Sequence, residues 1–236
     1  MSIGLQRSQL ALSHLLGTGG VTGTPPKPTF RIGLGHPGNC PTKPTLLICI
    51  FDDSGSMLGG SDSTGHRYLE AELAFERISR RCACDREMAA ILHMNRPTSA
   101  DRPALLLNRR AKSDLVGGLM VPRDGDGASA MADTLARAHQ IATVHPDHRA
   151  TLVAFSDYEL VDNMPTLTAD MASFPGSVHA VVMRSKPPAE LIAEDTITVT
   201  HVANGEPPGA VARALFASIT AHRPGASSAA TTGKDG

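Results

Sequence analysis

The sequence places three oxygen-bearing side chains at alternate positions directly after an apolar run. Asp52, Ser54 and Ser56 lie in the stretch "FDDSGSM", which follows "TLLICI". Alternate side chains of an extended segment point to the same side, so these three are expected to converge. A carboxylate and two hydroxyls are hard oxygen ligands, which suit Mg²⁺ or Mn²⁺ better than a soft metal. Three protein oxygens do not complete a metal site, so further ligands are expected from other segments.

Two later segments offer such ligands. Ser129 lies in the glycine-containing stretch "DGDGASAM", and Asp157 ends the apolar run "ATLVAFSD" in the position equivalent to Asp52. In an open α/β sheet, ligands bind outside the carboxyl ends of the strands. Both residues are therefore expected at the same edge of a sheet as the first motif.

The elements that would position these residues alternate between strands and helices. Buried strands are predicted at 46–51, 87–94, 104–108, 150–157 and 178–183, and an edge strand at 196–202. Helices are predicted at 66–81, 129–142 and 188–194, with a last helix opened by Pro207 and Pro208. This alternation predicts an α/β fold, with a Rossmann-like, doubly wound, mostly parallel central sheet that helices flank on both faces.

The domain organisation follows from where this periodicity starts and stops. Residues 1–44 are rich in Gly and Pro and read as an N-terminal extension, while residues 45–222 form one domain. Residues 223–236 are small, polar and aperiodic, which predicts a disordered C-terminal tail.

Composition excludes several function classes. The net charge of −1 provides no basic field for nucleic acid, and eight aromatic residues (six Phe, two Tyr) offer few stacking platforms. No apolar stretch is long enough to span a bilayer, and the first residues make a poor secretory signal. The cysteine pair at 82–84 lacks a second pair at zinc-site spacing. A cytoplasmic protein is expected, and the excess of Arg over Lys suggests a bacterial source.

At this point the motif "DDSGSM" becomes recognisable, because it resembles the Asp-x-Ser-x-Ser motif of von Willebrand factor A (vWA) domains. In that family the motif belongs to a metal-ion-dependent adhesion site, which binds Mg²⁺ or Mn²⁺. The resemblance implies that Asp52, Ser54 and Ser56 are ligands of the first loop. It also implies that Ser129 stands where the family usually has Thr, and Asp157 where it often has the Asp of a Thr-Asp-Gly turn. The similarity covers about residues 44 to 222.

The chain departs from the family pattern in three places. Ser replaces Thr at position 129, which keeps the hydroxyl, and "SDY" replaces the Thr-Asp-Gly turn. The connection "LGGSDSTG" at 58–65 is longer than in typical members, and it is expected at the rim of the binding face, where Asp62 would add charge. This last departure bears on the choice of partner rather than on metal binding.

The resemblance implies a metal-dependent protein-binding module. Two carboxylates and three neutral hydroxyls nearly neutralise a divalent ion and leave one position for the Asp or Glu of a partner protein. None of the loops offers an evident general base, so an enzyme is not expected. Intracellular members of the family often work beside AAA+ ATPases, which makes such an ATPase a candidate partner by resemblance alone.

Other interpretations remain open from the residues. A phosphoacceptor receiver domain would use the acidic pair Asp52-Asp53, with Asp114 and the pair Lys186-Pro187, but no apolar strand precedes Asp114 and the intervals are long. The first motif can also be a solvated turn, and Asp157 a simple strand-end acid. Ser129 can be the N-cap of the helix that follows it, and that role is compatible with metal binding.

Overall fold

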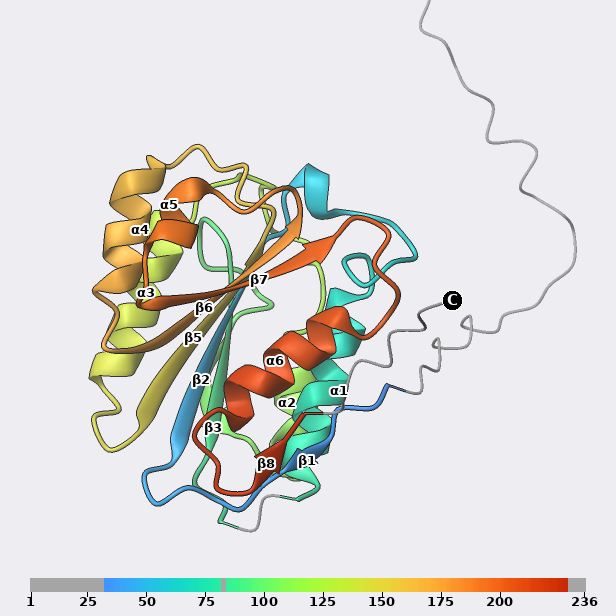
Figure 1. The fold of residues 1–236 in the computed structure, drawn as a ribbon, viewed down its shortest axis with the longest axis vertical. Helices are drawn as coiled ribbons and strands as arrows, with labels where there is room; N and C mark the ends of the chain where they lie inside the picture. The colour runs from blue at the N-terminus through green and yellow to red at the C-terminus, as the bar shows by residue number, and fades with distance from the viewer. Residues whose placement is uncertain (1–31, 82–83, 229–236) are drawn as a thin grey trace, which may run out of the picture. The chain divides into compact units, whose positions relative to one another are not determined.

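The computed structural model describes residues 32–81 and 84–228. Within these ranges the chain forms a six-stranded sheet with the strand order β4-β3-β2-β5-β6-β7 (Figure 1). All neighbours pair in parallel except β4, which is antiparallel to β3 at one edge. The strands are β2 Thr45–Phe51, β3 Met88–His93, β4 Arg102–Leu106, β5 Arg149–Ser156, β6 Gly176–Arg184 and β7 Ile197–Ala203. The predicted α/β fold is confirmed, with β7 at an edge as expected.

Helices cover both faces of the sheet. They are α1 Arg67–Ser79, α2 Lys112–Val116, α3 Ala132–Thr143, α4 Met164–Ala172, α5 Ala189–Ala193 and α6 Ala210–Thr220. Helices α1, α2 and α6 pack on one face, and α3, α4 and α5 pack on the other (Figure 1). Alternate residues of β2 belong to the two hydrophobic clusters, so this strand is buried on both sides.

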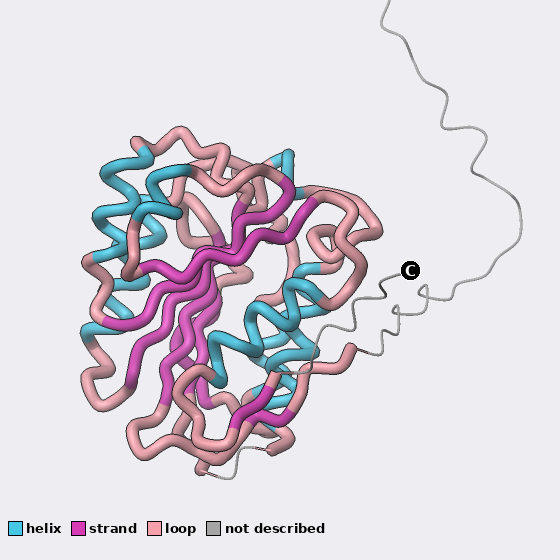
Figure 2. Tube along the Cα trace, viewed as in Figure 1, coloured by secondary structure: helices cyan, strands magenta, loops and turns pink. Residues whose placement is uncertain are grey.

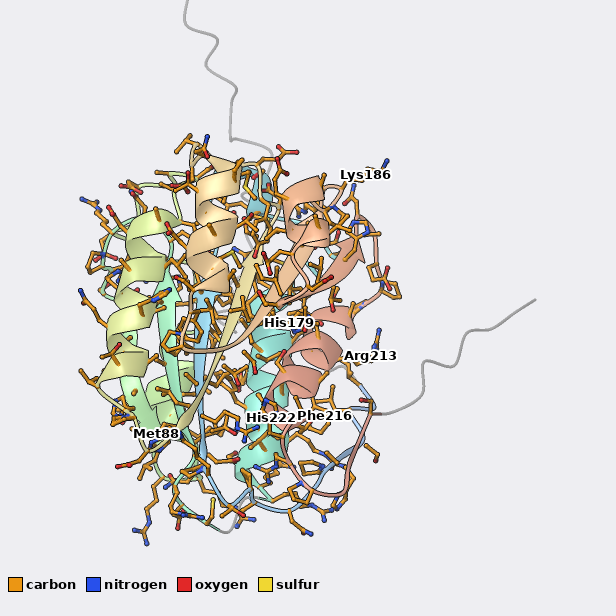
Figure 3. All side chains as sticks on the ribbon, turned by 60° about the vertical axis from the view of Figure 1, so that its left-hand side comes forward. Met88, His179, Lys186, Arg213, Phe216 and His222 are labelled. Carbon is orange, nitrogen blue, oxygen red and sulfur yellow. The ribbon has the colours of Figure 1, made fainter. Side chains whose placement is uncertain are left out.

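The parallel strands end at one edge of the sheet, where most of the long loops gather (Figure 2). Figure 3 marks the two ends of the sheet: Met88 is the first residue of β3, and Lys186 follows the last residue of β6. The candidate residues Asp52 and Asp157 both follow strands at the Lys186 end.

The domain is larger than the predicted range 45–222. Strand β1 (His36–Pro37) pairs antiparallel with β8 (Ala226–Ser227), close to the start of β3. Arg223 donates from Nε to the carbonyl of Pro37 at 2.6 Å and forms a buried salt bridge with Glu87. A two-residue ladder and one ion pair produce no periodic pattern in a sequence. Periodicity alone therefore does not reveal that residues 36–37 and 223–227 pack on the domain.

The remaining predictions for the ends of the chain, an extension over 1–31 and a tail over 229–236, lie outside the described residues. Two corrections concern helices. The helix predicted from 129 begins at Ala132, and neither α2 nor α4 is predicted from the sequence. Asn163 caps α4 by accepting a hydrogen bond from the N–H of Thr166, and Pro165 lies in its first turn. That cap-and-proline signal was present in the sequence.

Candidate metal site at the carboxyl edge of the sheet

The first loop turns sharply where β2 ends. Oδ1 of Asp52 accepts a hydrogen bond from the backbone N–H of Ser54 at 2.8 Å, and the 3-10 helix η2 (Gly55–Met57) follows. The hydroxyls of Ser54 and Ser56 lie 3.0 Å apart. The extended conformation expected for this motif is therefore wrong, but the Asp turn and the short helix bring the same side chains together.

Asp157 follows β5 and lies next to the first loop. The backbone N–H of Asp52 donates to the carbonyl of Phe155 at 2.9 Å, which extends the pairing of β2 with β5 past the end of β2. Asp157 is 3% exposed, and its charge acts on the carboxyl of Asp52. The structure therefore brings the two predicted carboxylates close to each other at the ends of neighbouring strands.

Ser156 is a site residue that the sequence interpretation missed. Its hydroxyl donates to Oδ2 of Asp52 at 2.6 Å and accepts from the N–H of Tyr158 at 2.9 Å. Tyr158 has a positive φ of 58°, a backbone strain that non-glycine residues adopt mostly where the surroundings require it. Aligning the ends of the two apolar runs would have placed Ser156 opposite Asp52, because Phe51 pairs with Phe155.

Ser129 lies in the loop before α3, half-buried, and its carbonyl accepts from the N–H of Val161 at 2.9 Å. This bond joins it to the loop that follows Asp157. Helix α3 has Met131 at its N-cap position, so the interpretation of Ser129 as the N-cap is wrong. The N–H of Met131 instead donates to Asp162 at 2.6 Å, which leaves the Ser129 hydroxyl free of capping.

The electrostatics of Asp52 are unusual for a buried carboxylate. Burial raises the pKa of Asp52 above its ordinary value, hydrogen bonds from Ser156 and Ser54 partly oppose the rise, and the charge of Asp157 adds to it. Neither Asp52 nor Asp157 forms a salt bridge in the described part of the chain. Two neighbouring buried carboxylates without a basic partner are costly, and a cation is the partner that would offset that cost.

The pKa of Asp53 is shifted in the opposite direction to that of Asp52. Its Oδ1 accepts from Arg67 at 2.8 Å and from the Tyr68 hydroxyl, and its Oδ2 lies 2.6 Å from Nδ1 of His93. Burial would raise the pKa of Asp53, but the hydrogen bonds from His93 and Tyr68 and the charge of Arg67 outweigh it and hold the pKa low. The cluster ties β2 to α1 and β3. Asp53 therefore has basic partners within the fold, whereas both oxygens of Asp52 accept hydrogen bonds from neutral donors only among the described residues.

Two residues at the end of β6 connect the loops that carry Ser56 and Asp157. Arg184, at a positive φ of 68°, donates to the carbonyl of Ser56 and, at 2.8 Å, to that of Gly59. The hydroxyl of the next residue, Ser185, donates to the carbonyl of Asp157. We call Arg184 and Ser185 the β6 clamp. No sequence pattern predicted it.

Burial would raise the pKa of Asp62, but hydrogen bonds from the backbone of Gly65 and Gly205 and the charge of Arg184 lower it, so this side chain carries its negative charge in the loop 58–65. Its carboxylate accepts from the N–H of Gly65 at 2.9 Å and of Gly205 at 3.1 Å. It therefore attaches the long loop 58–65 to the connection between β7 and α6. The extra length of this loop is therefore held by hydrogen bonds inside the domain.

The donor set fits a small divalent cation. Neighbouring ligands of an octahedral ion at about 2.1 Å are separated by about 3.0 Å, which equals the distance between the hydroxyls of Ser54 and Ser56. The described residues contain no group of three His, Cys, Asp or Glu side chains arranged to bind a metal. A metal here would consequently depend on serine hydroxyls and on the pair of carboxylates, a hard-oxygen set.

Known proteins with this arrangement of elements were found by structure rather than by sequence. No protein-family model matches the chain, and no curated protein matches it. The VWA domain of SpRpn10 superposes with a TM-score of 0.52 at 13% identity, covering 72% of this chain and 93% of that domain. The fold is that of a von Willebrand factor A domain.

Two larger proteins contain the same vWA fold. Proximal thread matrix protein 1 from the mussel byssus matches with a TM-score of 0.51 and 13% identity, over 77% of this chain. The pilus adhesin SpaC from Lactobacillus rhamnosus GG matches with a TM-score of 0.58 and 12% identity, over 83%. The chain spans 48% of the length of the mussel protein and 32% of that of the adhesin.

The structure gives no support to the interpretation of the chain as a phosphoacceptor receiver domain. Asp114 lies within helix α2 rather than at a strand end, and Asp53 is occupied by Arg67, Tyr68 and His93. In the described ranges, no helix is long and apolar enough to cross a membrane.

Proposed function

We propose that this vWA-fold domain binds Mg²⁺ or Mn²⁺ at the carboxyl edge of its sheet and uses the ion to capture an acidic residue of a partner protein. One observation carries the proposal. Asp52 and Asp157 are both buried at the ends of neighbouring strands, neither forms a salt bridge within the described residues, and the hydrogen-bonded hydroxyls of Ser54 and Ser56 lie in the same loop as Asp52.

The roles of the residues follow from their chemistry. The hydroxyls of Ser54, Ser56 and Ser129 would act as neutral ligands, and Asp52 and Asp157 would supply two negative charges, directly or through water. The bound ion would provide one Lewis-acidic position for an outside carboxylate. Ser156 and the N–H of Ser54 already orient both oxygens of Asp52, so little reorganisation is needed.

A binding role is favoured over catalysis. Asp53 and His93, the titratable pair beside the site, hold each other inside the domain instead of facing a substrate. A structural neighbour named as a pilus adhesin agrees with a role in binding, although its likeness concerns the fold. An AAA+ ATPase as partner and a cytoplasmic location in a bacterium remain predictions from the family resemblance and the composition.

Thermal unfolding in a magnesium titration tests the proposal. A ligand that binds only the folded state at about 100 times its Kd stabilises it by about 2.7 kcal/mol, which would raise Tm by several degrees. We expect this rise for the wild type and for the control Asp170→Asn, an exposed carboxylate on α4. We expect no rise for the double variant Asp52→Asn/Asp157→Asn. Equal stabilisation of the double variant and the wild type would refute the site.

A further inference from the structure

Exposed apolar side chains gather in the loops around the candidate metal site. Four residues of this kind lie in loops that follow β2, β4 and β5: Leu58 (47% exposed), Met120 (44%), Val121 (43%) and Val161 (80%). Single exposed apolar residues are ordinary, but their concentration at one functional edge indicates an interaction surface.

Two of these residues lie in the chain near candidate ligands. Leu58 directly follows η2, the turn that carries Ser56. The N–H of Val161 donates to the carbonyl of Ser129, so these two residues are neighbours. We define the apolar rim as Leu58, Met120, Val121 and Val161.

Met120 and Val121 approach the site from the side of β3. The carbonyl of Gly118, just before them, lies 3.0 Å from Nε2 of His93, and His93 contacts Asp53 beside the first ligand. The apolar rim thus has members from the loops after β2, β4 and β5. Lys186, which projects at this end of the sheet in Figure 3, marks the side of β6.

The exposed charges on these loops, and on the first turns of the helices that follow them, are mostly acidic. The exposed acids are Asp124, Asp126, Asp133, Glu159 and Glu190, and the exposed bases are Arg96, Arg123 and Lys186. Arg96 lies 3.7 Å from Asp126 and donates to the carbonyl of Asp124, so part of this charge is paired within the domain. A surface with more acids than bases has no basic field, and it repels a strongly acidic partner.

We propose that the partner is a protein segment with a single Asp or Glu flanked by large apolar side chains. The carboxylate would occupy the open position of the metal, and the flanking side chains would cover the apolar rim. This inference rests on the proposed function and specifies the partner of that same site. Polyacidic segments are disfavoured, because beyond the one ligand position the surface offers them apolar groups and internally paired charges.

The inference is tested by selecting displayed peptides of eight random residues on the immobilised full chain in Mg²⁺, with elution by EDTA. Selections run in parallel on the wild type, on Leu58→Ser/Val161→Ser and on Val144→Ser. Val144 is the matched control, because it is 70% exposed but lies at the far end of α3, before β5 begins.

We expect the wild type and Val144→Ser to enrich peptides with one acid and Leu, Ile, Met or Phe within two positions of it. Titration of the best peptide should give about tenfold or more weaker binding to Leu58→Ser/Val161→Ser, since each buried apolar side chain contributes on this scale. The same peptide with Asn or Gln in place of its acid should not bind.

The outcomes separate the inference from the proposed function. Enrichment of EDTA-eluted acidic peptides without apolar neighbours, or of polyacidic ones, would overturn the inference and leave the metal-dependent capture of acids intact. Peptides without an acid that resist EDTA, or no enrichment at all, would count against both. Equal affinity of the best peptide for the rim variant and the wild type would also overturn the inference.

Discussion

At the scale of single residues, two consecutive aspartates end β2 in opposite environments. Asp53 is held by Arg67, Tyr68 and His93, whereas Asp52 is affected by the charge of Asp157 and, among the described residues, has only neutral hydrogen-bond donors to offset its burial. The carboxylate of Asp53 therefore stabilises the fold through ion pairs, whereas the ionised form of Asp52 is disfavoured by burial and by the charge of Asp157.

This contrast predicts different effects of two similar substitutions in metal-free buffer. Asp53→Asn should lower the free energy of unfolding by about 2–4 kcal/mol, because it leaves Arg67, 2% exposed, without its carboxylate. Asp52→Asn should change it by less than about 1 kcal/mol or raise it, because a repelled buried charge is removed. Urea denaturation measures both values. Equal losses for the two variants would contradict the contrast.

His179 on β6 predicts a pH dependence of stability away from the candidate site. Its Nδ1 donates to the Ser218 hydroxyl, which itself donates to the carbonyl of Ala214, and Thr200 donates to its Nε2 at 2.8 Å. The ring is consequently neutral, and burial lowers its pKa to about 4. Figure 3 places it between the sheet and α6.

The direction of this pH dependence follows from which state of the protein binds a proton first. The unfolded histidine, with a pKa of about 6.5, takes up a proton before the folded one, so stability is present above pH 6.5 and is lost as the pH falls toward 4. The loss should reach about 3 kcal/mol and should be reduced in His179→Gln. The exposed His201→Gln serves as control. Parallel pH profiles for wild type and His179→Gln in urea denaturation would contradict the prediction.

The sequence indicates at which edge of the sheet the candidate residues lie, but it does not reveal the contacts that depend on strand register and tertiary geometry. Asp52, Ser54, Ser56, Ser129 and Asp157 follow or open regular elements, so their shared edge could be foreseen. Ser156 required knowledge of strand register, and Arg184 required knowledge of which carbonyls it meets. Hydrogen bonds to carbonyls depend on tertiary geometry and leave no pattern of residue types.

At the scale of elements, the end of β6 links the loop after β2 to the loop after β5. The β6 clamp, Arg184 and Ser185, donates hydrogen bonds to backbone carbonyls of those loops, so it fixes the chain rather than any ligand directly. Positioning groups of this kind commonly contribute one to two orders of magnitude to metal affinity.

Arg184→Lys should therefore weaken Mg²⁺ binding about tenfold while the domain stays folded, because one ammonium cannot reproduce the fork that spans the carbonyls of Ser56 and Gly59. Calorimetric titration of Mg²⁺ measures the affinity, and circular dichroism checks the fold. Lys186→Ala is the control, since this exposed cation lies two residues away. Unchanged affinity in a folded Arg184→Lys protein would exclude a positioning role.

Helices and strands could be predicted where their buried residues repeat at a regular spacing in the sequence, and not where that repeat is missing. The apolar run of β2 and the stripe of α1 were identified because their buried faces repeat. The start of α3 was placed too early because a serine before an apolar stripe resembles a cap, whereas the N–H at that end is satisfied by Asp162 from another loop. The antiparallel direction of β4 depends on its connection and is not encoded in its five residues.

At the scale of the whole molecule, the described ends of the chain and the candidate site occupy opposite ends of the sheet. Strands β1 and β8 pair near the start of β3, where Arg223 holds Glu87. The carboxyl edge, with its candidate ligands and apolar rim, lies at the other end of the sheet from this contact. A byssus matrix protein and a pilus adhesin share the fold at 12–13% identity, and a fold by itself does not set a function.

The most direct test of the central claim is a crystal structure of the wild type grown with Mn²⁺ and measured for anomalous scattering. We predict one strong peak at the carboxyl edge of the sheet, about 2.0–2.3 Å from the hydroxyl oxygens of Ser54 and Ser56, with Asp52 and Asp157 bound directly or through water. A fully folded structure in saturating Mn²⁺ with no peak there, and with Asp52 and Asp157 still unpaired, would contradict it.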